Sequence, residues 1–451
     1  MNRRAICLAA LFALAACRQA ETTVPLAAAP ASAPVARNVL LRQAVDALKS
    51  AQRDGDVALH VRADRLATEL IERDGPDAVT LTLRAAARAG QHRFDEAVTW
   101  ADQAIALNPD DPAPYGVLID ALVEIGKYDR AVDTAQFLLD LKPTYMAYAR
   151  AAYLRALYGD QAGGLRLMQL AIDACPSNAP AERAWLLTHL GQDALAAGDS
   201  GIAAHAFAEA LALRPADGRA LQGLAALAVA RGEIDAAIDL YQRAAAGAVA
   251  ADAQSALADL YLASGRPSDA ARAATAAEQA ARLLLESPGR PEGRQLALLY
   301  ADRGTNLDTA LHLAEQAAAW RDDVYTNDTL AWVLYRSGRI DEARQTSQRA
   351  LRLGSRDPVL LQHGALIAAA AGDADTAARL IGAHPSAGAG RVAPAGAAGR
   401  CRHYGRARRR PRRRGRAYAI GECSGQLPRG RAELIARIRP RTYARAAQRC
   451  R

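Results

Sequence analysis

The sequence predicts an all-α fold, an α-α solenoid or superhelix of about nine stacked helix hairpins followed by a tail that does not belong to it. Two observations carry this prediction. The 451 residues are 51% hydrophobic but only 5% aromatic, and alanine dominates the hydrophobic count, which suits crowded helix cores better than pleated sheets. A small residue also recurs along most of the chain at intervals of mostly 33 or 34 residues, the pattern of a repeat array.

Residues 1–16 have the pattern of an export signal peptide. Asn2-Arg3-Arg4 supplies a positive n-region, and Ala5–Ala16 is an uncharged apolar run. As a helix this run would reach roughly 18 Å, whereas a hydrocarbon core is about 30 Å thick, so a signal peptide fits and a transmembrane helix does not.

The segment Leu14-Ala15-Ala16-Cys17 resembles the bacterial lipobox. The resemblance implies cleavage before Cys17, with a diacylglyceryl group on its thiol and an acyl chain such as palmitate on its amine, and several chains anchor a protein stably. An ordinary cleaved signal with an incidental cysteine is the alternative. Arg18 stands where an Asp would be the inner-membrane retention signal of Gram-negative lipoproteins. We therefore expect a lipid anchor in the outer membrane, with the protein facing the periplasm.

The remainder of the N-terminal region divides into a tether and a first helical unit. Residues 17–37 are rich in Pro and Ala and lack an apolar period, which predicts a semi-extended tether. Residues 38–76 contain two helical stretches, Val39–Gln52 and Val57–Arg73, and we expect them to form a divergent N-terminal unit.

Residues 77–382 carry the repeat array. Its anchor is a small residue, usually five residues after a glycine, and successive anchors are 34, 33, 39, 34, 33, 40, 33 and 34 residues apart. The spacings of 39 and 40 predict insertions at Pro176–Glu182 and Ser287–Gly293, where we expect the superhelix to change direction. The anchors are Ala97, Ala131, Gly164, Ala203, Ala237, Ala270, Ala310, Ala343 and Ala377.

Helical spacing explains the hairpin in physical terms. In Pro114–Glu124 the apolar residues fall at i, i+3, i+4 and i+7, which is one face of a helix. Gly126 then breaks this helix, and a second apolar stripe starts at the anchor Ala131. Such a hairpin has too little core by itself, so it has to stack on its neighbours.

The period and its fixed positions resemble the tetratricopeptide repeat, a helix-turn-helix unit of 34 residues. A second small residue lies twelve residues before the anchor in seven of nine units, and an alanine lies seven residues after it in seven of nine. Prolines close the first four units at Pro109, Pro143, Pro176 and Pro215. The resemblance implies that the first helix of each unit lines a concave groove that binds one or more proteins or peptides.

Family registers also select candidate partner-binding residues. In the family, positions eleven, eight and fifteen residues before each anchor tend to face the groove. The last four residues selected in this way cluster, and an aromatic pair flanked by Asp and Arg has the composition of a binding hot spot, with packing between adjacent repeats as the alternative. The registers and their neighbours select Asp120, Tyr153, Gln192, Gln222, Asp259, Asp302, Asp328, Trp332, Tyr335 and Arg336.

We expect no catalytic residues, no cofactor and no metal site. The motifs HExxH, GxxxxGK and GxGxxG are absent, and the spacing of Cys401, Cys423 and Cys450 matches no zinc pattern. Gly198–Gly201 mimics the nucleophile loop of trypsin-like proteases, but it falls in an inter-helix turn, where Asp199 or Ser200 is placed to cap the next helix. Cys175 is expected to be a buried thiol at a helix end.

Charge separates residues 383–451 from the body. This tail has 19 Arg and two acidic residues, a net charge of +17, and because the whole chain carries +9, the body carries −8. Two interpretations of the tail stay open. It is either a functional basic arm for phosphate groups or the product of out-of-frame translation, since the helix of the last unit stops after Ile381 and His384 occupies an alanine position. Either way we expect it to be disordered.

Together these patterns predict a scaffold lipoprotein without enzymatic activity, which binds protein partners in envelope assembly or secretion and meets the membrane through its N-terminal lipid. One alternative is an accessory subunit of an envelope enzyme complex. The other gives the main role to the Arg-rich tail as a binder of anionic lipopolysaccharide or nucleic acid. Because the body is acidic, nucleic acid is not the partner we expect for it.

Overall fold

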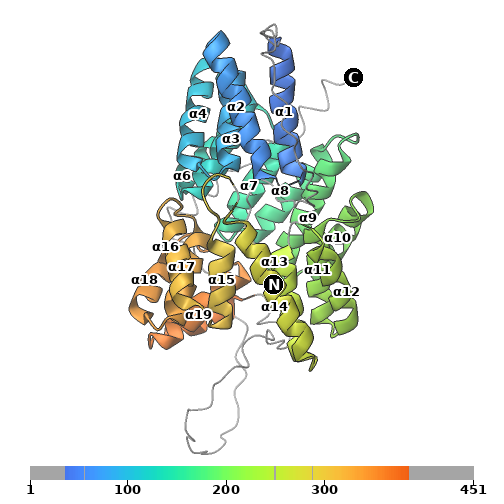
Figure 1. Ribbon diagram of the computed structural model, residues 1–451, viewed down its shortest axis with the longest axis vertical. Coiled ribbons are helices and arrows are strands. Elements are labelled where there is room, and N and C mark those ends of the chain that lie inside the picture. Colours follow the sequence, from blue (N-terminus) through green and yellow to red (C-terminus); the bar gives the residue numbers. More distant parts are fainter. Residues whose placement is uncertain (1–35, 55, 248–249, 287, 385–451) are drawn as a thin grey trace, which may run out of the picture.

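The computed structural model describes residues 36–54, 56–247, 250–286 and 288–384, and within these ranges every regular element is an α-helix (Figure 1). The fold class predicted from the sequence is confirmed. The export signal, Cys17, nearly all of the tether and residues 385–451 lie outside the described residues. The helices are α1 (Arg37–Asp54), α2 (Val57–Asp74), α3 (Ala78–Gly90), α4 (Phe94–Leu107), α5 (Pro112–Glu124), α6 (Tyr128–Leu141), α7 (Tyr145–Leu157), α8 (Gln161–Ala174), α9 (Pro180–Ala197), α10 (Ser200–Leu213), α11 (Gly218–Ala230), α12 (Ile234–Ala245), α13 (Ala250–Ala263), α14 (Pro267–Leu283), α15 (Arg294–Arg303), α16 (Leu307–Ala318), α17 (Val324–Arg336), α18 (Ile340–Ala350), α19 (Pro358–Ala370) and α20 (Ala374–Ala383).

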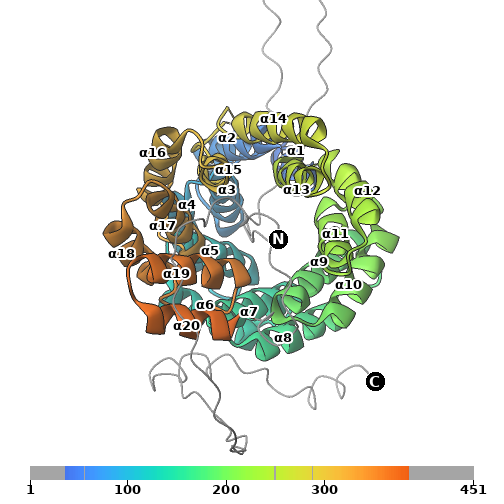
Figure 2. The same ribbon diagram turned by 90° about the horizontal axis from the view of Figure 1, so that it is seen from below.

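Consecutive helices pair into antiparallel hairpins, and the hairpins stack side by side into a superhelix. Figure 2 shows the stack curving into a ring, with first helices such as α9, α11 and α15 on the inside and second helices such as α10, α12 and α16 on the outside. The pair α1 and α2 forms the N-terminal unit, and α3 to α20 form nine further hairpins among the described residues. The odd-numbered helices therefore form the inner layer of the ring, and the even-numbered helices form the outer layer.

Local sequence starts each helix. Asp111 caps α5 by accepting a hydrogen bond from the Ala113 amide, and Asp199 caps α10 in the same way from the Ile202 amide at 2.9 Å. The segment that mimics a protease loop is thus a helix cap, as its sequence indicates.

Small residues let neighbouring helices approach closely. Phe207 of α10 is fully buried, and its ring lies between Gly191 of α9 and Gly223 of α11. A Cβ atom at Gly223 would lie 2.2 Å from the Phe207 Cζ atom, so any larger residue there would overpack the junction between the two hairpins. The anchor alanines Ala97, Ala131 and Ala203 are likewise fully buried.

Six hairpins complete one turn of the superhelix, so its second turn lies against its first. Three loops of its second turn contact three hairpin turns of its first, and each contact joins hairpins six units apart. The Arg290 amide donates to the Gln91 carbonyl oxygen at 3.1 Å. Gly126 lies against Asp322, and Gly159 lies against Gly354.

At Gly126 and Gly159, both the backbone conformation and the lack of space require glycine. Gly126 and Gly159 have φ of 72° and 82°, which favours glycine, and a Cβ at either would lie 2.5 Å from a carbonyl oxygen of the second turn. We call this line of contacts the seam.

A buried ion cluster holds the seam together. Arg321, whose side chain is 2% exposed, contacts the carboxylates of Glu124 from the first turn and of Glu292 and Asp323 from the second. The Arg321 Nη1 atom lies 2.7 Å from Glu292 Oε2, and its Nε atom lies 3.1 Å from Asp323 Oδ2. Burial is the largest single influence and raises the pKa values of Glu292 and Asp323, but Arg321, Arg294 and hydrogen bonds together outweigh it, so both pKa values are lowered. We call these four residues the Arg321 cluster.

Aromatic side chains surround the Arg321 cluster. Trp320 lies 6.2 Å from His92 and 6.1 Å from Phe94, measured between ring centroids, and it joins the second turn to the first. The Tyr128 hydroxyl accepts a hydrogen bond from the Val324 amide at 2.9 Å. These rings exclude water, which strengthens the ion pairs they cover.

The two insertions take different forms. Part of Pro176–Glu182 extends α9, which begins at Pro180 and has 18 residues where α5 and α7 have 13. The described part of Ser287–Gly293, residues 288–293, instead lies in the loop between α14 and α15 and carries Arg290, which pairs with Asp95 of α4 at 3.0 Å. The second insertion therefore forms part of the seam.

Removing the arginine of the Arg321 cluster should open the ring. Arg321→Ala leaves three buried carboxylates without their shared cation, which should cost about 3–5 kcal/mol at the seam. Small-angle scattering should show a larger radius of gyration, and hydrogen exchange should rise at residues 290–323, while the helical signal stays almost unchanged. Arg339→Ala, which removes an exposed ion pair with Glu342, is the matched control and should change neither measurement. An unchanged radius in Arg321→Ala would show that the cluster does not hold the turns together.

Candidate functional site

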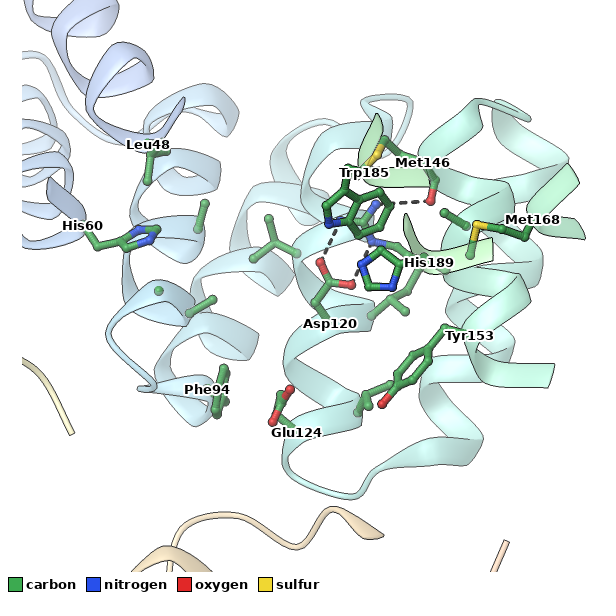
Figure 3. A pocket seen from close by; sticks show the side chains of 18 of the residues that line it. Leu48, His60, Phe94, Asp120, Glu124, Met146, Tyr153, Met168, Trp185 and His189 are labelled. Carbon is green, nitrogen blue, oxygen red and sulfur yellow. Dashed lines mark hydrogen bonds and ion pairs between the residues drawn. The ribbon is translucent and has the colours of Figure 1, made fainter. Parts of the chain in front are cut away.

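The strongest candidate site is a cavity of about 130 Å³ on the inner side of the first superhelical turn (Figure 3). Its walls come from the first helices α3, α5, α7 and α9, with further residues from the N-terminal unit, α4 and α8. It is lined by Leu48, His60, Ala86, Ala89, Gly90, Phe94, Val117, Ile119, Asp120, Val123, Glu124, Met146, Ala149, Arg150, Tyr153, Met168, Trp185, His189 and Asp193. We call this space the inner cavity.

Helical spacing brings these side chains to one face of each helix. On α7 the lining residues lie at positions 146, 149, 150 and 153, and on α9 they lie at positions 185, 189 and 193. Residues three or four apart share a helix face, so each helix presents one continuous stripe to the cavity. On α3 the lining residues Ala86, Ala89 and Gly90 are small, and the ring of His60 packs directly against Gly90.

The polar centre of the inner cavity is a forked ion pair. Arg150 donates from Nε to Asp120 Oδ1 at 2.9 Å and from Nη2 to Asp120 Oδ2 at 2.7 Å. It also donates to the carbonyl oxygens of Gly116 and Met146. A Cβ at Gly116 would lie 3.1 Å from the Arg150 Cζ atom, so the absence of a side chain there makes room for the guanidinium.

Aromatic side chains stand beside this pair. The rings of Trp185 and His189 lie 4.2 Å apart between centroids, and Figure 3 shows Trp185 and His189 close to Asp120, with Tyr153 further along the wall. Burial raises the pKa of the Asp120 carboxyl more than Arg150 lowers it, and burial raises the pKa of the Tyr153 phenol well above its usual range.

Glu124 connects the inner cavity with the seam. It lines the cavity and also contacts Arg321 in the Arg321 cluster. The position of this wall therefore depends on the closure of the ring.

The ten residues selected from the sequence all lie on first helices, α5 through α17 in odd numbers. The inner cavity brings together only Asp120 and Tyr153 of them. Gln192, Gln222 and Asp259 lie on α9, α11 and α13, away from that cavity. The other five lie at the junction of α15, α17 and α19.

This second group is tightly packed. Trp332 is 8% exposed, stacks on His363 at 4.1 Å and on Tyr335 at 5.1 Å between ring centroids, and donates from Nε1 to Asp302 at 2.8 Å. Asp328 is buried as well and pairs with His363 at 2.9 Å, while Arg336 lies over the Trp332 ring. Little of the indole is left for a partner, so the geometry favours packing between adjacent hairpins.

Sequence analysis missed Arg150, Trp185, His189 and Asp193. Helical spacing in the sequence could have identified them. Each lies on a predicted first helix, three or four residues from another residue that lines the cavity. The family registers selected only some positions of each helix and passed over these.

The described part of the chain also bears on the expectations for metal sites, for Cys175 and for membrane spans. Those residues hold no group of three or more His, Cys, Asp or Glu side chains placed to bind a metal ion. Cys175 is a free, buried thiol that caps the end of α8, as expected, and burial raises its pKa. Within the same residues, none of the helices combines the length and apolar character that a membrane span needs.

One family model matches part of the chain. Residues 189–256 match the family described as tetratricopeptide repeat. No curated protein has a sequence that matches the chain.

Several solved structures are similar to parts of the chain. A thermophilic TPR protein from Thermus thermophilus is 18% identical, with 43% of this chain and 99% of that chain covered and a TM-score of 0.37. The human IFIT1 dimer with PPP-AAAA is 15% identical over 71% of this chain and 73% of that chain, with a TM-score of 0.47. MamA is 17% identical over 36% and 91%, with a TM-score of 0.30.

The burial of Trp332 leads to a stability prediction. Trp332→Ala removes a stacked, hydrogen-bonded indole and should lower the free energy of unfolding of the α15–α19 region by about 3–5 kcal/mol. Hydrogen exchange in urea, followed for α15 to α19, measures this change. Phe137→Ala, at a side chain that is 48% exposed, is the control and should have little effect. Unchanged exchange together with lost partner binding would instead make Trp332 a binding hot spot.

Proposed function

We propose that the chain is a scaffold of the tetratricopeptide repeat type, without enzymatic activity, that holds a segment of a partner protein on the inner side of its ring. The observation that carries this proposal is the inner cavity, where stripes from four first helices converge around aromatic and charged side chains. Concave sites with a few placed polar groups on an apolar lining are typical of binding sites. Repeat solenoids bind partners on such extended concave surfaces.

We further propose that the scaffold is an outer-membrane lipoprotein that faces the periplasm of a Gram-negative bacterium and serves envelope assembly or secretion. The support is in the sequence: the lipobox-like Leu14-Ala15-Ala16-Cys17, the Arg at position 18 and the Pro-rich tether. The tether would hold the ring a short distance from the bilayer.

Site-specific photo-crosslinking in cells tests the scaffold function. A benzoylphenylalanine in place of Tyr153 faces the inner cavity and should crosslink to a discrete partner protein. The same residue in place of Phe137, which is exposed on the second helix α6, is the matched control and should give no such product. Crosslinks from position 137 but not from position 153 would contradict binding in the inner cavity.

Lipid attachment has its own test. Cys17→Ser removes the thiol that would carry the diacylglyceryl group, so the protein should leave the membrane fraction or stay unprocessed. Membrane fractionation and the intact mass of the mature chain measure both effects. Membrane retention with a normal mature mass in this variant would rule out the anchor.

A further inference from the structure

We propose that the inner cavity binds a cationic side chain, arginine or lysine, of the partner's bound segment. The proposal rests on the proposed function and specifies its ligand chemistry. Four observations carry it: the charge of the lining, the engagement of its only arginine, a buried histidine without a partner, and the size and aromatic character of the space.

The lining has more negative than positive groups. Asp120, Glu124 and Asp193 contribute carboxyl groups, and Arg150 is the only Lys or Arg among the lining residues. Arg321 contacts Glu124 from behind the wall, but it also contacts Glu292 and Asp323, and the further cation there, Arg294, pairs with Glu292 and not with the lining. A cationic ligand would relieve this imbalance, and an anionic one would add to it.

Arg150 is already paired with a carboxylate of the lining. Its Nε and Nη2 atoms hold both oxygens of Asp120, and its Nη1 atom donates to the Met146 carbonyl oxygen at 3.3 Å. A carboxylate or phosphate could reach only the remaining N–H groups of Nη1 and Nη2, where it would stand beside the like-charged carboxylate of Asp120. The arrangement therefore disfavours the capture of a free C-terminal carboxylate.

His60 adds an observation that does not depend on charge. It lines the cavity opposite Trp185, as Figure 3 shows, and it is 3% exposed with neither ring nitrogen bonded to a partner. Burial, with a smaller contribution from His92, lowers the pKa of His60 to about 4, so the ring is neutral at pH 7. A neutral imidazole has one nitrogen that accepts a hydrogen bond, and the N–H groups of an arginine or lysine side chain are donors without acceptor character.

The size and the aromatic lining fit one such side chain. A cavity of about 130 Å³ is close to the engineered cavity of roughly 150 Å³ that holds one benzene molecule. Trp185, Tyr153 and Phe94 offer ring faces on which a cation can lie, and Met146 and Val117 can cover its aliphatic stem. A single flexible side chain therefore fills the space without rearranging the helices.

Fluorine NMR on the full-length protein labelled with 5-fluorotryptophan tests the proposal. The chain has four Trp, and Trp185→Phe assigns the resonance in the cavity. Titration with Nα-acetyl-arginine amide should shift the Trp185 resonance, with a Kd at least fivefold lower than for the neutral isostere Nα-acetyl-citrulline amide. The resonances of Trp100 and Trp332 should not move with the same concentration dependence. Equal affinities for the two compounds would overturn the proposal.

A pair of charge-matched variants separates the cavity from the overall charge of the ring. Asp193→Asn removes a carboxylate of the lining and should raise the Kd for acetyl-arginine amide at least threefold. Asp239→Asn removes the same charge from α12 at an exposed position, and the Kd should stay unchanged. Equal effects of the two variants would mean that arginine senses only the net charge, and the proposal would fail.

Crosslinking identifies the source of the cationic side chain and separates this proposal from the one on which it rests. A benzoylphenylalanine at Met146 should crosslink to another protein through a segment that contains Arg or Lys. Crosslinks to residues 385–451 of the same chain would assign the cavity to the Arg-rich tail and overturn the assignment to a partner. A partner segment crosslinked at Tyr153, with no preference for arginine over citrulline, would leave the scaffold function standing and refute the cationic ligand alone.

Discussion

The architecture depends on one buried cation shared by two turns of a superhelix. Helix hairpins can stack indefinitely, because each contacts only its neighbours, and their period alone does not determine whether the stack stays open or closes. In this chain Arg321 lies among Glu124, Glu292 and Asp323, and it ties a loop of the second turn to a helix end of the first. Removing three carboxylates and a guanidinium from water is costly, so the cluster is favourable only when all its members meet. The arrangement therefore specifies one closure of the ring among the many that stacking would permit.

One side chain, that of Glu124, belongs to both the inner cavity and the seam. Glu124 ends α5, where it both lines the inner cavity and contacts Arg321. Tyr128, four residues further along, accepts the Val324 amide from the second turn. The position of the Glu124 carboxylate in the cavity wall is therefore set by its ion pair with Arg321 across the seam.

Much of the fold could be predicted from the sequence, because the same spacing of small and apolar residues recurs in every repeat. Spacing fixed the hairpins, their inner and outer helices and the caps such as Asp199, all of which the structure contains. The closure was not predictable, because its residues occur once each and lie about 200 positions apart: the hydrogen bond from Arg321 to Glu124 spans 197 residues. In the sequence, the insertion Ser287–Gly293 appeared only as a deviation in repeat spacing. Its contribution to the seam, the ion pair of Arg290 with Asp95, depends on how the second turn lies against the first.

The candidate site likewise depends on residues that recur in every repeat and on residues that occur in one repeat only. Family registers identify helix faces, so they found Asp120 and Tyr153, but the inner cavity is bordered by small residues on α3 and by the larger Trp185 and Met146 on other repeats. Such a space depends on the difference between neighbouring repeats and not on what they have in common. At α17 the reverse holds, because His363 and Tyr335 fill the room around Trp332 and turn an aromatic with the composition of a hot spot into a packing residue. In a repeat protein the shared positions therefore build the scaffold, and the positions that differ between repeats are the ones to examine for its ligand.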